Sequence, residues 1–513
     1  MITLIGRKNG PIAGMHLVGC PNNRLYLLYK GRQSIKRGCM ARRHYLKTLS
    51  LILAVILPLV WCEPAGSISI KEEQELSQQF MRMISRYFEI VEDPQINDYV
   101  GQMGRKILSA LPPQPFNYHF YVIKEEVYNA FAIPAGCIFI NSGLLLAMDD
   151  EEELAGILSH EIAHVVSRHL SHRIDRSKKI DLATAAGMVA GIFLGVAGGS
   201  AEVGQAVLLG SAAAGQTAAL AYSREDESQA DHLGLGYLEK SGYSAQGLLE
   251  VLKKIRGKQW FGSDQVPTYM MTHPAVEERI VYIDTWMSTQ KDRHQARRPS
   301  DHFHRMQLRL KALYGEANAT TQYFKNAMAQ NPENPDWAYG YGLILARMGQ
   351  RKDALPYLQQ VLAKNAMDPL ILGDVGKIYF ENGQIGDALR VLQGVDSLPG
   401  SNPEALFYLG RAHMEQGNYQ AAAEIFERLV QRQDDYTPTY RFLGETYGKL
   451  ERMPEAHYFL GIYHFRKGDD RIAYHHLTKA QKGIQDPAKL ETIKRTLEII
   501  GKLPRPEEEE QER

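Results

Sequence analysis

A glycine recurs every 34 residues in the C-terminal half of this 513-residue chain. The glycines with this spacing are Gly342, Gly376, Gly410 and Gly444. Alanine follows the same period at Ala354, Ala388, Ala422 and Ala456. A repeat of this length forms a unit that cannot bury its own apolar face, so copies must stack against one another. The period therefore predicts a solenoid for this half of the chain.

The phrases "RMGQRKDAL", "ENGQIGDAL" and "EQGNYQAAA" each follow the pattern of a helix, a turn and a second helix. Small residues at two fixed positions of a 34-residue helical unit are the tetratricopeptide signature, because they let the two helices of a repeat lie close together. Gly461 and Ala473 follow after half a period, which indicates a helix shared at the end of the stack. We predict an α-solenoid over residues 300–500, with an atypical leading repeat, and a solvated acidic tail over 501–513.

The N-terminal region has the pattern of an export signal. Arg42, Arg43 and Lys47 precede an apolar run over 49–61, and polar sequence follows. This is a charged segment followed by an apolar segment too short to span a bilayer comfortably. We therefore predict that residues 1–62 are an N-terminal extension plus a signal peptide, with Met40 favoured as the true start. An exported, periplasmic protein is expected.

Composition excludes two classes of protein. The 59 basic and 59 acidic residues cancel, and no basic stripe with interleaved aromatic residues occurs, which argues against binding of nucleic acid. Three of the four cysteines lie at or before position 62, so a disulfide framework is not available. We expect the remaining Cys137 to be a small buried residue.

A helix carrying two histidines contains the strongest chemical signal. Residues 149–170, "DDEEELAGILSHEIAHVVSRHL", combine an acidic first turn with helical spacing of apolar residues, and strands are predicted at 116–123 and 137–141. His160 and His164 are about 40° apart around a helix, so both rings can reach one ion. Glu161 can act as general base on a water activated by that ion. The alternative is two exposed helix histidines.

A catalytic zinc ion needs a third protein ligand. His169 lies nine residues after His160, on the opposite face of a continuous helix, so we expect it and His172 to be surface residues. The later sequence "YSREDESQADHLG" contains two carboxylates four residues apart, Glu227 and Asp231. Glu227 could ligate zinc while Asp231 accepts the second ring N–H of a ligand histidine. Alternatively, acidic residues at a helix start simply favour the helix dipole.

These motifs resemble the HExxH metallopeptidase family that includes the HtpX-like and BepA-like proteases. Besides HExxH and "SREDESQAD", the matching segments are "EDPQINDYVGQMGRKI", "YNAFAIPAGCIFINSGLL" and "THPAVEERI". The chain departs from the family pattern at Ala135, where glycine is usual, and at Gln229, where glutamate is common. The resemblance implies a mostly α chain: an α+β, gluzincin-type metalloprotease domain with a small β-sheet over 63–295, followed by the α-solenoid.

The resemblance also assigns roles to individual residues. It implies one zinc ion per subunit, held by His160, His164 and Glu227, with Glu161 as catalytic base. Asp231 carries over as a proton donor, beside our own interpretation that it orients a ligand histidine. His273 matches a histidine that in BepA-like proteins can approach the zinc ion and silence it. Spacing alone makes it only a histidine before a proline.

An export signal together with tetratricopeptide repeats favours the BepA-like, periplasmic branch. The branch implies a zinc endopeptidase with a chaperone-like role in the assembly and quality control of outer-membrane β-barrel proteins. Its expected substrates are unfolded or misassembled outer-membrane proteins, and its expected partner is the β-barrel assembly machinery. The strand at 137–141 is expected to be an edge against which an extended substrate adds.

Two alternatives remain open. One is a tetratricopeptide scaffold for outer-membrane assembly whose protease is silenced. The other is an HtpX-like integral membrane protease, because residues 182–223 are almost free of charge. Alanine and glycine dominate that segment, which favours close-packed helices, an apolar loop or peripheral membrane contact over insertion.

Overall fold

The computed structural model describes residues 68–176, 222–260, 268–290, 300–364, 366–398, 402–433 and 436–501. These described residues all belong to one compact unit. The expected signal peptide, the acidic tail and nearly all of the apolar 182–223 segment lie outside the described residues. Among the described residues, no helix has the length and apolar character needed to cross a membrane. The boundaries 63–295 and 300–500 stay predictions.

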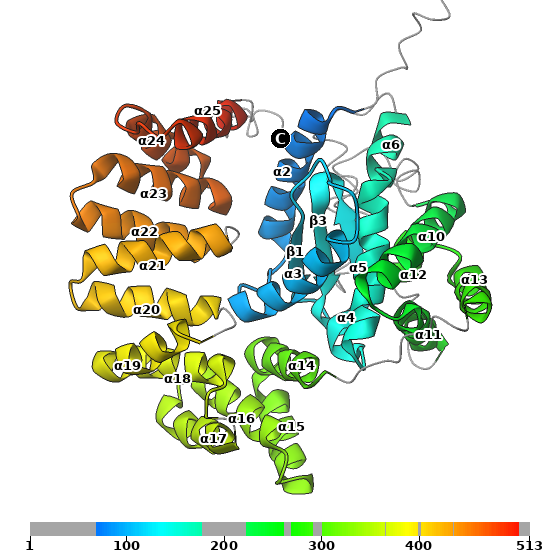
Figure 1. The fold of residues 1–513 in the computed structure, drawn as a ribbon, viewed down its shortest axis with the longest axis horizontal. Coiled ribbons are helices and arrows are strands. Elements are labelled where there is room, and N and C mark those ends of the chain that lie inside the picture. The colour runs from blue at the N-terminus through cyan, green and yellow to red at the C-terminus, as the bar shows by residue number, and fades with distance from the viewer. Residues whose placement is uncertain are drawn as a thin grey trace, which may run out of the picture. The chain divides into compact units, whose positions relative to one another are not determined.

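The first part of the unit places helices around a small sheet (Figure 1). Its elements are α2 (Ile70–Tyr87), α3 (Pro94–Leu108), β1 (His119–Ile123), β2 (Ala130–Ile133), η1 (Pro134–Gly136), β3 (Cys137–Asn141), α4 (Ser142–Ala147), α5 (Glu151–Val166), α6 (His169–Arg176), α10 (Arg224–Ser241), α11 (Ala245–Trp260), α12 (Thr268–Thr272) and α13 (Val276–Thr289). The predicted strand at 137–141 is found as β3, and the one predicted at 116–123 begins later, at His119. Cys137 is buried, as expected.

The sheet has the strand order β1-β3-β2. β1 pairs parallel to β3, and β2 pairs antiparallel to it, with Ala130 opposite Ile140. The expectation that the strand at 137–141 forms the edge of the sheet is therefore wrong. β3 lies in the centre because the four buried residues of β2 form a strand of their own beside it.

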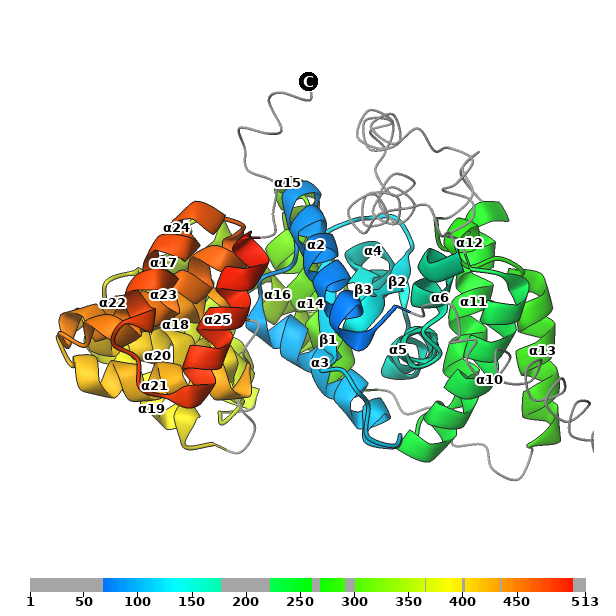
Figure 2. The ribbon, with the colours of Figure 1, turned by 90° about the horizontal axis from the view of Figure 1, so that it is seen from above.

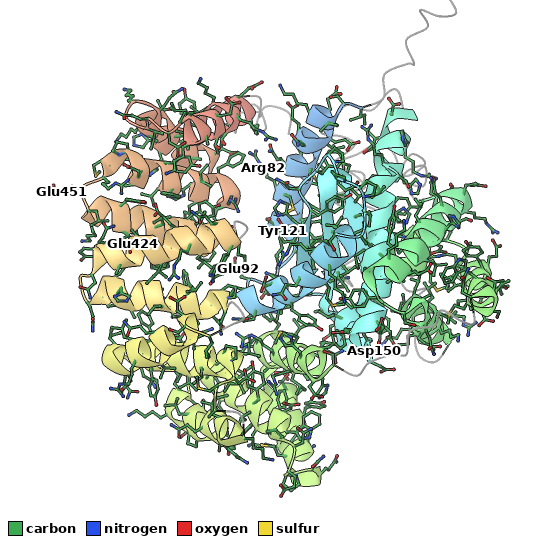
Figure 3. The ribbon with its side chains drawn as sticks, viewed as in Figure 1. Arg82, Glu92, Tyr121, Asp150, Glu424 and Glu451 are labelled. Atoms are coloured by element: carbon green, nitrogen blue, oxygen red, sulfur yellow. The ribbon has the colours of Figure 1, made fainter. Side chains whose placement is uncertain are left out.

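The helix with the two histidines is buried along most of its length. Asp150, labelled in Figure 3, is its N-cap and accepts a hydrogen bond from the backbone N–H of Glu153. α5 packs closely against α10 and α11 because the contacts are made through glycine. A Cβ on Gly156 would lie 2.6 Å from the backbone nitrogen of Leu248, and one on Gly234 would lie 3.3 Å from the backbone of Ser159.

Antiparallel helix pairs form the second part, as predicted (Figure 2). They are α14 (Asp301–Tyr314), α15 (Ala317–Gln330), α16 (Pro335–Arg347), α17 (Arg351–Lys364), α18 (Pro369–Glu381), α19 (Ile385–Asp396), α20 (Pro403–Glu415), α21 (Tyr419–Arg432), α22 (Thr437–Lys449), α23 (Met453–Lys467), α24 (Asp470–Gln481) and α25 (Pro487–Gly501). This arrangement confirms the fold class, a mostly α chain with one small sheet and a helical solenoid.

The repeating glycines lie where the helices of a pair meet. A Cβ on Gly376 would lie 2.4 Å from Leu392, and one on Gly410 would lie 2.6 Å from Phe426. In both pairs the residue that the glycine contacts lies on the second helix, sixteen residues after the glycine. The same relation holds for Gly461, where the contact is to Leu477 at 2.6 Å, so α23 serves as a first helix toward α24. The shared helix predicted from the half period is confirmed.

A fully buried arginine on α14 joins the two parts of the unit. Arg309 donates to the carboxylate of Asp93, the N-cap of α3, at 3.0 Å and to Asp374 on α18 at 2.6 Å. It also pairs with Glu404 on α20. Because a buried guanidinium must keep its partners, this contact fixes the first repeats against α3.

Candidate metal centre

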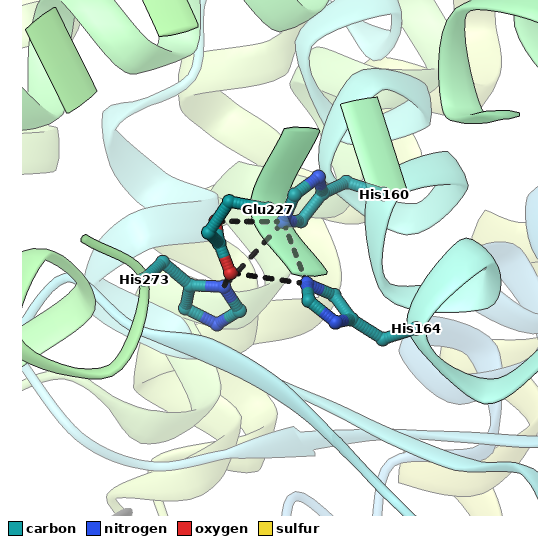
Figure 4. Close-up of side chains that lie close together, drawn as sticks. All are labelled: His160, His164, Glu227 and His273. Carbon is teal, nitrogen blue, oxygen red and sulfur yellow. Dashed lines mark hydrogen bonds and ion pairs between the residues drawn. The ribbon is translucent and has the colours of Figure 1, made fainter. Parts of the chain in front are cut away.

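Four buried side chains meet in a group capable of holding a metal ion (Figure 4). They are His160, His164, Glu227 and His273, and one ligand atom from each lies within 4.8 Å of the others. The Nε2 atoms of His160 and His164 are 3.0 Å apart. The Oε1 atom of Glu227 lies 3.3 Å from Nε2 of His164 and 3.1 Å from Nδ1 of His273.

Two helices and one short loop supply these side chains. His160 and His164 project from one face of α5, as the i, i+4 spacing predicts. Glu227 lies in the first turn of α10, which begins with a capping box between Ser223 and Asp226. His273 follows α12, 113 residues after His160. The structure thus brings together the three predicted ligands and the histidine whose role spacing left open.

Glu161 is buried beside this group without a donor of its own. Within the part of the chain that the structure describes, neither of its carboxylate oxygens accepts a hydrogen bond. His273 lies close to it at the site, with Nε2 3.6 Å from Oε1. Burial raises the pKa of the Glu161 carboxyl above its ordinary value. Such an unpartnered buried carboxylate requires a cation or water to satisfy it.

The buried charges around the site fit a divalent cation. Glu161, Glu227 and Asp231 are each fully buried, and the guanidinium of Arg279 pairs with Glu227 and Asp231. In the metal-binding state, with the histidines neutral and all three carboxyl groups ionised, these groups and one guanidinium leave two negative charges in excess. Imidazole nitrogen and carboxylate oxygen are also the donor atoms that zinc accepts in proteins. The residues present therefore fit a zinc ion.

Asp231 lies beside the ligand group rather than in it. Its Oδ1 is 2.9 Å from Nδ1 of His160, on the side of the ring away from His164. Arg279 donates to the other carboxylate oxygen from Nε at 2.8 Å. Burial alone would raise the pKa of Asp231, but the guanidinium of Arg279 holds it below its ordinary value.

Arg279 itself was not identified from the sequence. Its Nη1 lies 2.7 Å from Oε2 of Glu227, so one guanidinium contacts both Glu227 and Asp231 of α10. Burial would raise the pKa of Glu227, yet the neighbouring His273 and Arg279 hold it well below the ordinary value. The segment "THPAVEERI" contained this arginine, but no local pattern connects it with carboxylates 48 or 52 residues earlier.

The prediction that His169 is a surface residue is wrong. Its side chain is buried, and its Nδ1 lies 2.9 Å from Nδ1 of His164. The prediction assumed that the helix continues, but α5 ends at Val166 and Arg168 has a left-handed φ of 51°. The chain turns there, and α6 begins with His169 facing back toward His164. His172 is exposed, as predicted.

Both parts of the chain match models of known protein families. Residues 92–287 match the model of peptidase family M48. Residues 313–378 and 376–437 match two tetratricopeptide repeat models. These matches agree with the resemblance that the motifs indicate.

Three curated relatives illustrate the similarity. The beta-barrel assembly-enhancing protease of Escherichia coli K12 is 26% identical over 297 residues, which cover 58% of this chain and 60% of that protein. A putative beta-barrel assembly-enhancing protease of Vibrio cholerae is 26% identical over 311 residues, with 58% and 62% covered. Metalloprotease YcaL of Escherichia coli K12 is 33% identical over 172 residues, with 33% and 61% covered. The match thus spans about three fifths of the length of these relatives.

Proposed function

We propose that this chain, which carries a peptidase family M48 domain followed by tetratricopeptide repeats, is a zinc-dependent endopeptidase with one zinc ion per chain. The observation that carries the proposal is the buried group of His160, His164 and Glu227 beside the Glu161 carboxylate, which accepts no hydrogen bond among the described residues. Exposed histidines would favour the alternative of an ordinary polar helix, but both of these side chains are buried.

Each residue has a distinct role in this proposal. His160, His164 and Glu227 hold the ion. Bound zinc would polarise the scissile carbonyl and lower the pKa of a nearby water. Glu161 takes the proton from the attacking water and passes it to the leaving amine. Its raised pKa suits a group that must hold this proton between the two steps.

Asp231 acts by positioning in this scheme. Its two oxygens are engaged by His160 and Arg279, and it lies on the Nδ1 side of the His160 ring. A carboxylate in that place fixes the tautomer that leaves Nε2 free for the metal. These contacts favour the positioning role over the proton-donor role implied by the resemblance.

His273 regulates the site by occupying it. Its Nε2 donates to the backbone carbonyl of Ala130 at 3.3 Å, which leaves the lone pair on Nδ1. That Nδ1 lies 3.4 Å from Nε2 of His160, among the ligand atoms. His273 therefore supplies a fourth ligand and competes with substrate for the ion. It also occupies a carbonyl of β2, the strand next to the site.

Substrates are extended polypeptides that add to the edge of β2. Among the described residues β2 pairs with β3 alone, so its other side can accept a further strand with little dependence on sequence once His273 releases the carbonyl of Ala130. This suits a quality-control endopeptidase that meets unfolded chains. Relatives named beta-barrel assembly-enhancing proteases support β-barrel proteins as clients. The proposal takes these clients to be outer-membrane proteins in the periplasm, with degradation of the misfolded ones. The repeats would bind the β-barrel assembly machinery.

The test combines metal content with cleavage of an unfolded model polypeptide by the full chain. Glu161→Gln should abolish cleavage while zinc stays near one ion per chain. Glu227→Ala should lose the ion, whereas the exposed neighbour Glu225 offers a matched control, Glu225→Ala, that keeps both. Cleavage by Glu161→Gln, or full zinc occupancy in Glu227→Ala, would contradict the assignment.

A scaffold with a silenced protease is the second candidate, and the place of His273 among the ligands favours it. In that case Glu161→Gln should restore outer-membrane assembly in cells lacking the gene as well as the wild type does. Carbonate extraction of membranes distinguishes the remaining alternative, an HtpX-like integral membrane protease. Such a protease would stay in the membrane pellet, whereas a periplasmic protein would be released.

A further inference from the structure

His169 lies in a buried corner behind the metal-binding face of α5. Its side chain is 4% exposed, and the left-handed residue Arg168 turns the chain so that the ring points back toward His164. The two Nδ1 atoms are 2.9 Å apart, a hydrogen-bond distance. The Nε2 of His164 lies at the opposite end of its ring, 3.3 Å from Oε1 of Glu227. His169 therefore contacts the ligand histidine on the side away from the ion.

The partners of His169 fix the direction of these hydrogen bonds. Its Nε2 lies 3.0 Å from Oε1 of Gln229, and an amide oxygen only accepts. Nε2 of His169 must then carry its proton, so Nδ1 has the lone pair. That Nδ1 accepts from Nδ1–H of His164, which leaves the lone pair of His164 on Nε2. This is the tautomer that a metal ligand with Nε2 toward the ion requires.

Contacts on both sides hold this arrangement in place. Tyr222 stacks on the ring of His164, with centroids 3.8 Å apart and planes 25° apart. Arg168 donates to Glu73 of α2 at 2.6 Å. Arg173 of α6 donates to Asp226 at the start of α10 at 2.8 Å. The chain is thus held to α2 just before His169 and to α10 just after it, so moving the backbone of His169 away from His164 would break an ion pair.

We propose that His169 is a positioning residue that sets the tautomer and ring orientation of His164 through the relay from Gln229. The inference rests on the metal site of the proposed function. In this role His169 acts through His164 and is not itself a ligand. The role accounts for the burial of a histidine outside the HExxH motif beside that motif. Outer partners of this kind change metal affinity by about 10- to 100-fold in known metal sites.

The test measures zinc affinity of the full chain by competition with a chelator. His169→Leu fills the space but accepts no hydrogen bond, and we expect it to bind zinc about 10- to 100-fold more weakly than the wild type. His169→Asn places an oxygen the same number of bonds from the backbone as Nδ1, so it should recover most of the affinity. His172→Leu, on the exposed side of α6, is the matched control and should bind like the wild type.

The outcomes separate this inference from the proposed function. Wild-type protein that binds no zinc would overturn the proposed function. If the wild type binds zinc and the His169→Leu variant binds it equally tightly, only the role of His169 is overturned. The role of His169 is also overturned if His169→Leu and His169→Asn lose the same amount of zinc affinity. This comparison requires that the metal-free variants unfold at the same urea concentration as the metal-free wild type. If His169→Leu does not fold, Gln229→Leu removes the acceptor at an exposed residue and should also weaken zinc binding.

Discussion

Oδ1 of Asp231 lies 2.9 Å from Nδ1 of His160, and both side chains are fully buried. The contact joins Asp231 of α10 to the first histidine of α5. It separates two roles that sequence alone left open, because a positioning carboxylate and a proton donor respond differently to the same substitution.

Asp231→Asn should lower zinc affinity by about 10- to 100-fold, because an amide supports the ligand tautomer of His160 less well than a charged carboxylate. Cleavage should fall at limiting zinc and recover substantially when zinc is saturating. The measurement is cleavage rate against free zinc concentration. A variant that stays inactive with its zinc site full would instead support the proton-donor role.

His273→Ala should raise cleavage of an unfolded polypeptide while zinc stays bound. The three remaining ligands, His160, His164 and Glu227, hold the ion, and the substituted side chain no longer competes with substrate. If the competing contact contributes about 1.4 kcal/mol, the rate rises about tenfold. Initial rates at equal zinc occupancy provide the test, and an unchanged or lower rate would exclude an inhibitory role.

Local periodicity was enough to predict the parts of the site that depend on one helix. His160 and His164 share a face because of helical spacing alone, and the repeat glycines meet their partners because the period is conserved along the chain. The spacing of Glu227 and Asp231 likewise placed both on one face of their helix. These features need no knowledge of how distant segments pack.

The remaining features depend on where elements end and on contacts far apart in sequence. α5 stops before Arg168, where neither glycine nor proline signals a turn, so the position of His169 could not be predicted. β2 is only four residues long and wholly buried, without the alternation that identifies a strand. Arg279 and His273 reach the site only through the packing of α12 against α11 and of α13 against α10 and α11.

Asp374 should make the repeats less stable as the pH rises. Burial, the largest cause, raises its pKa to about 6 from an ordinary 3.8, although Arg309 opposes the shift. A raised carboxyl pKa means that the folded protein binds a proton more tightly than the unfolded chain, so this contribution is lost as the pH rises through about 6. Glu404, which shares Arg309, has a lowered pKa and stays ionised over this window.

Replacing the titrating group removes this dependence. Between about pH 5 and pH 8, the wild type should lose about 1.4 kcal/mol relative to Asp374→Asn. Urea unfolding of both proteins at the two pH values measures the difference between them. An equal change in the two proteins would mean that Asp374 keeps an ordinary pKa in the fold.

Glu451 occupies a position that glycine fills in the preceding repeats. Gly349, Gly383 and Gly417 end their helices with φ between 76° and 80°, and Glu451 follows at the next 34-residue step with φ of 60°. It lies at the turn after α22, at the outer end of the repeat helices, where Figure 3 labels it. A side chain in the left-handed region costs about 1–2 kcal/mol, a cost that glycine avoids.

Glu451→Gly should therefore raise the free energy of unfolding by about 1 kcal/mol without changing cleavage, because glycine adopts the required backbone without strain. Gly417→Ala is the reciprocal variant and should lower the free energy of unfolding by a similar amount, since it introduces a Cβ at a φ of 76°. Urea midpoints of the two variants and the wild type test both directions. The physical argument predicts opposite signs at equivalent turns, so a loss of stability in both variants would show that the Glu451 side chain stabilises its turn by more than its backbone strain costs.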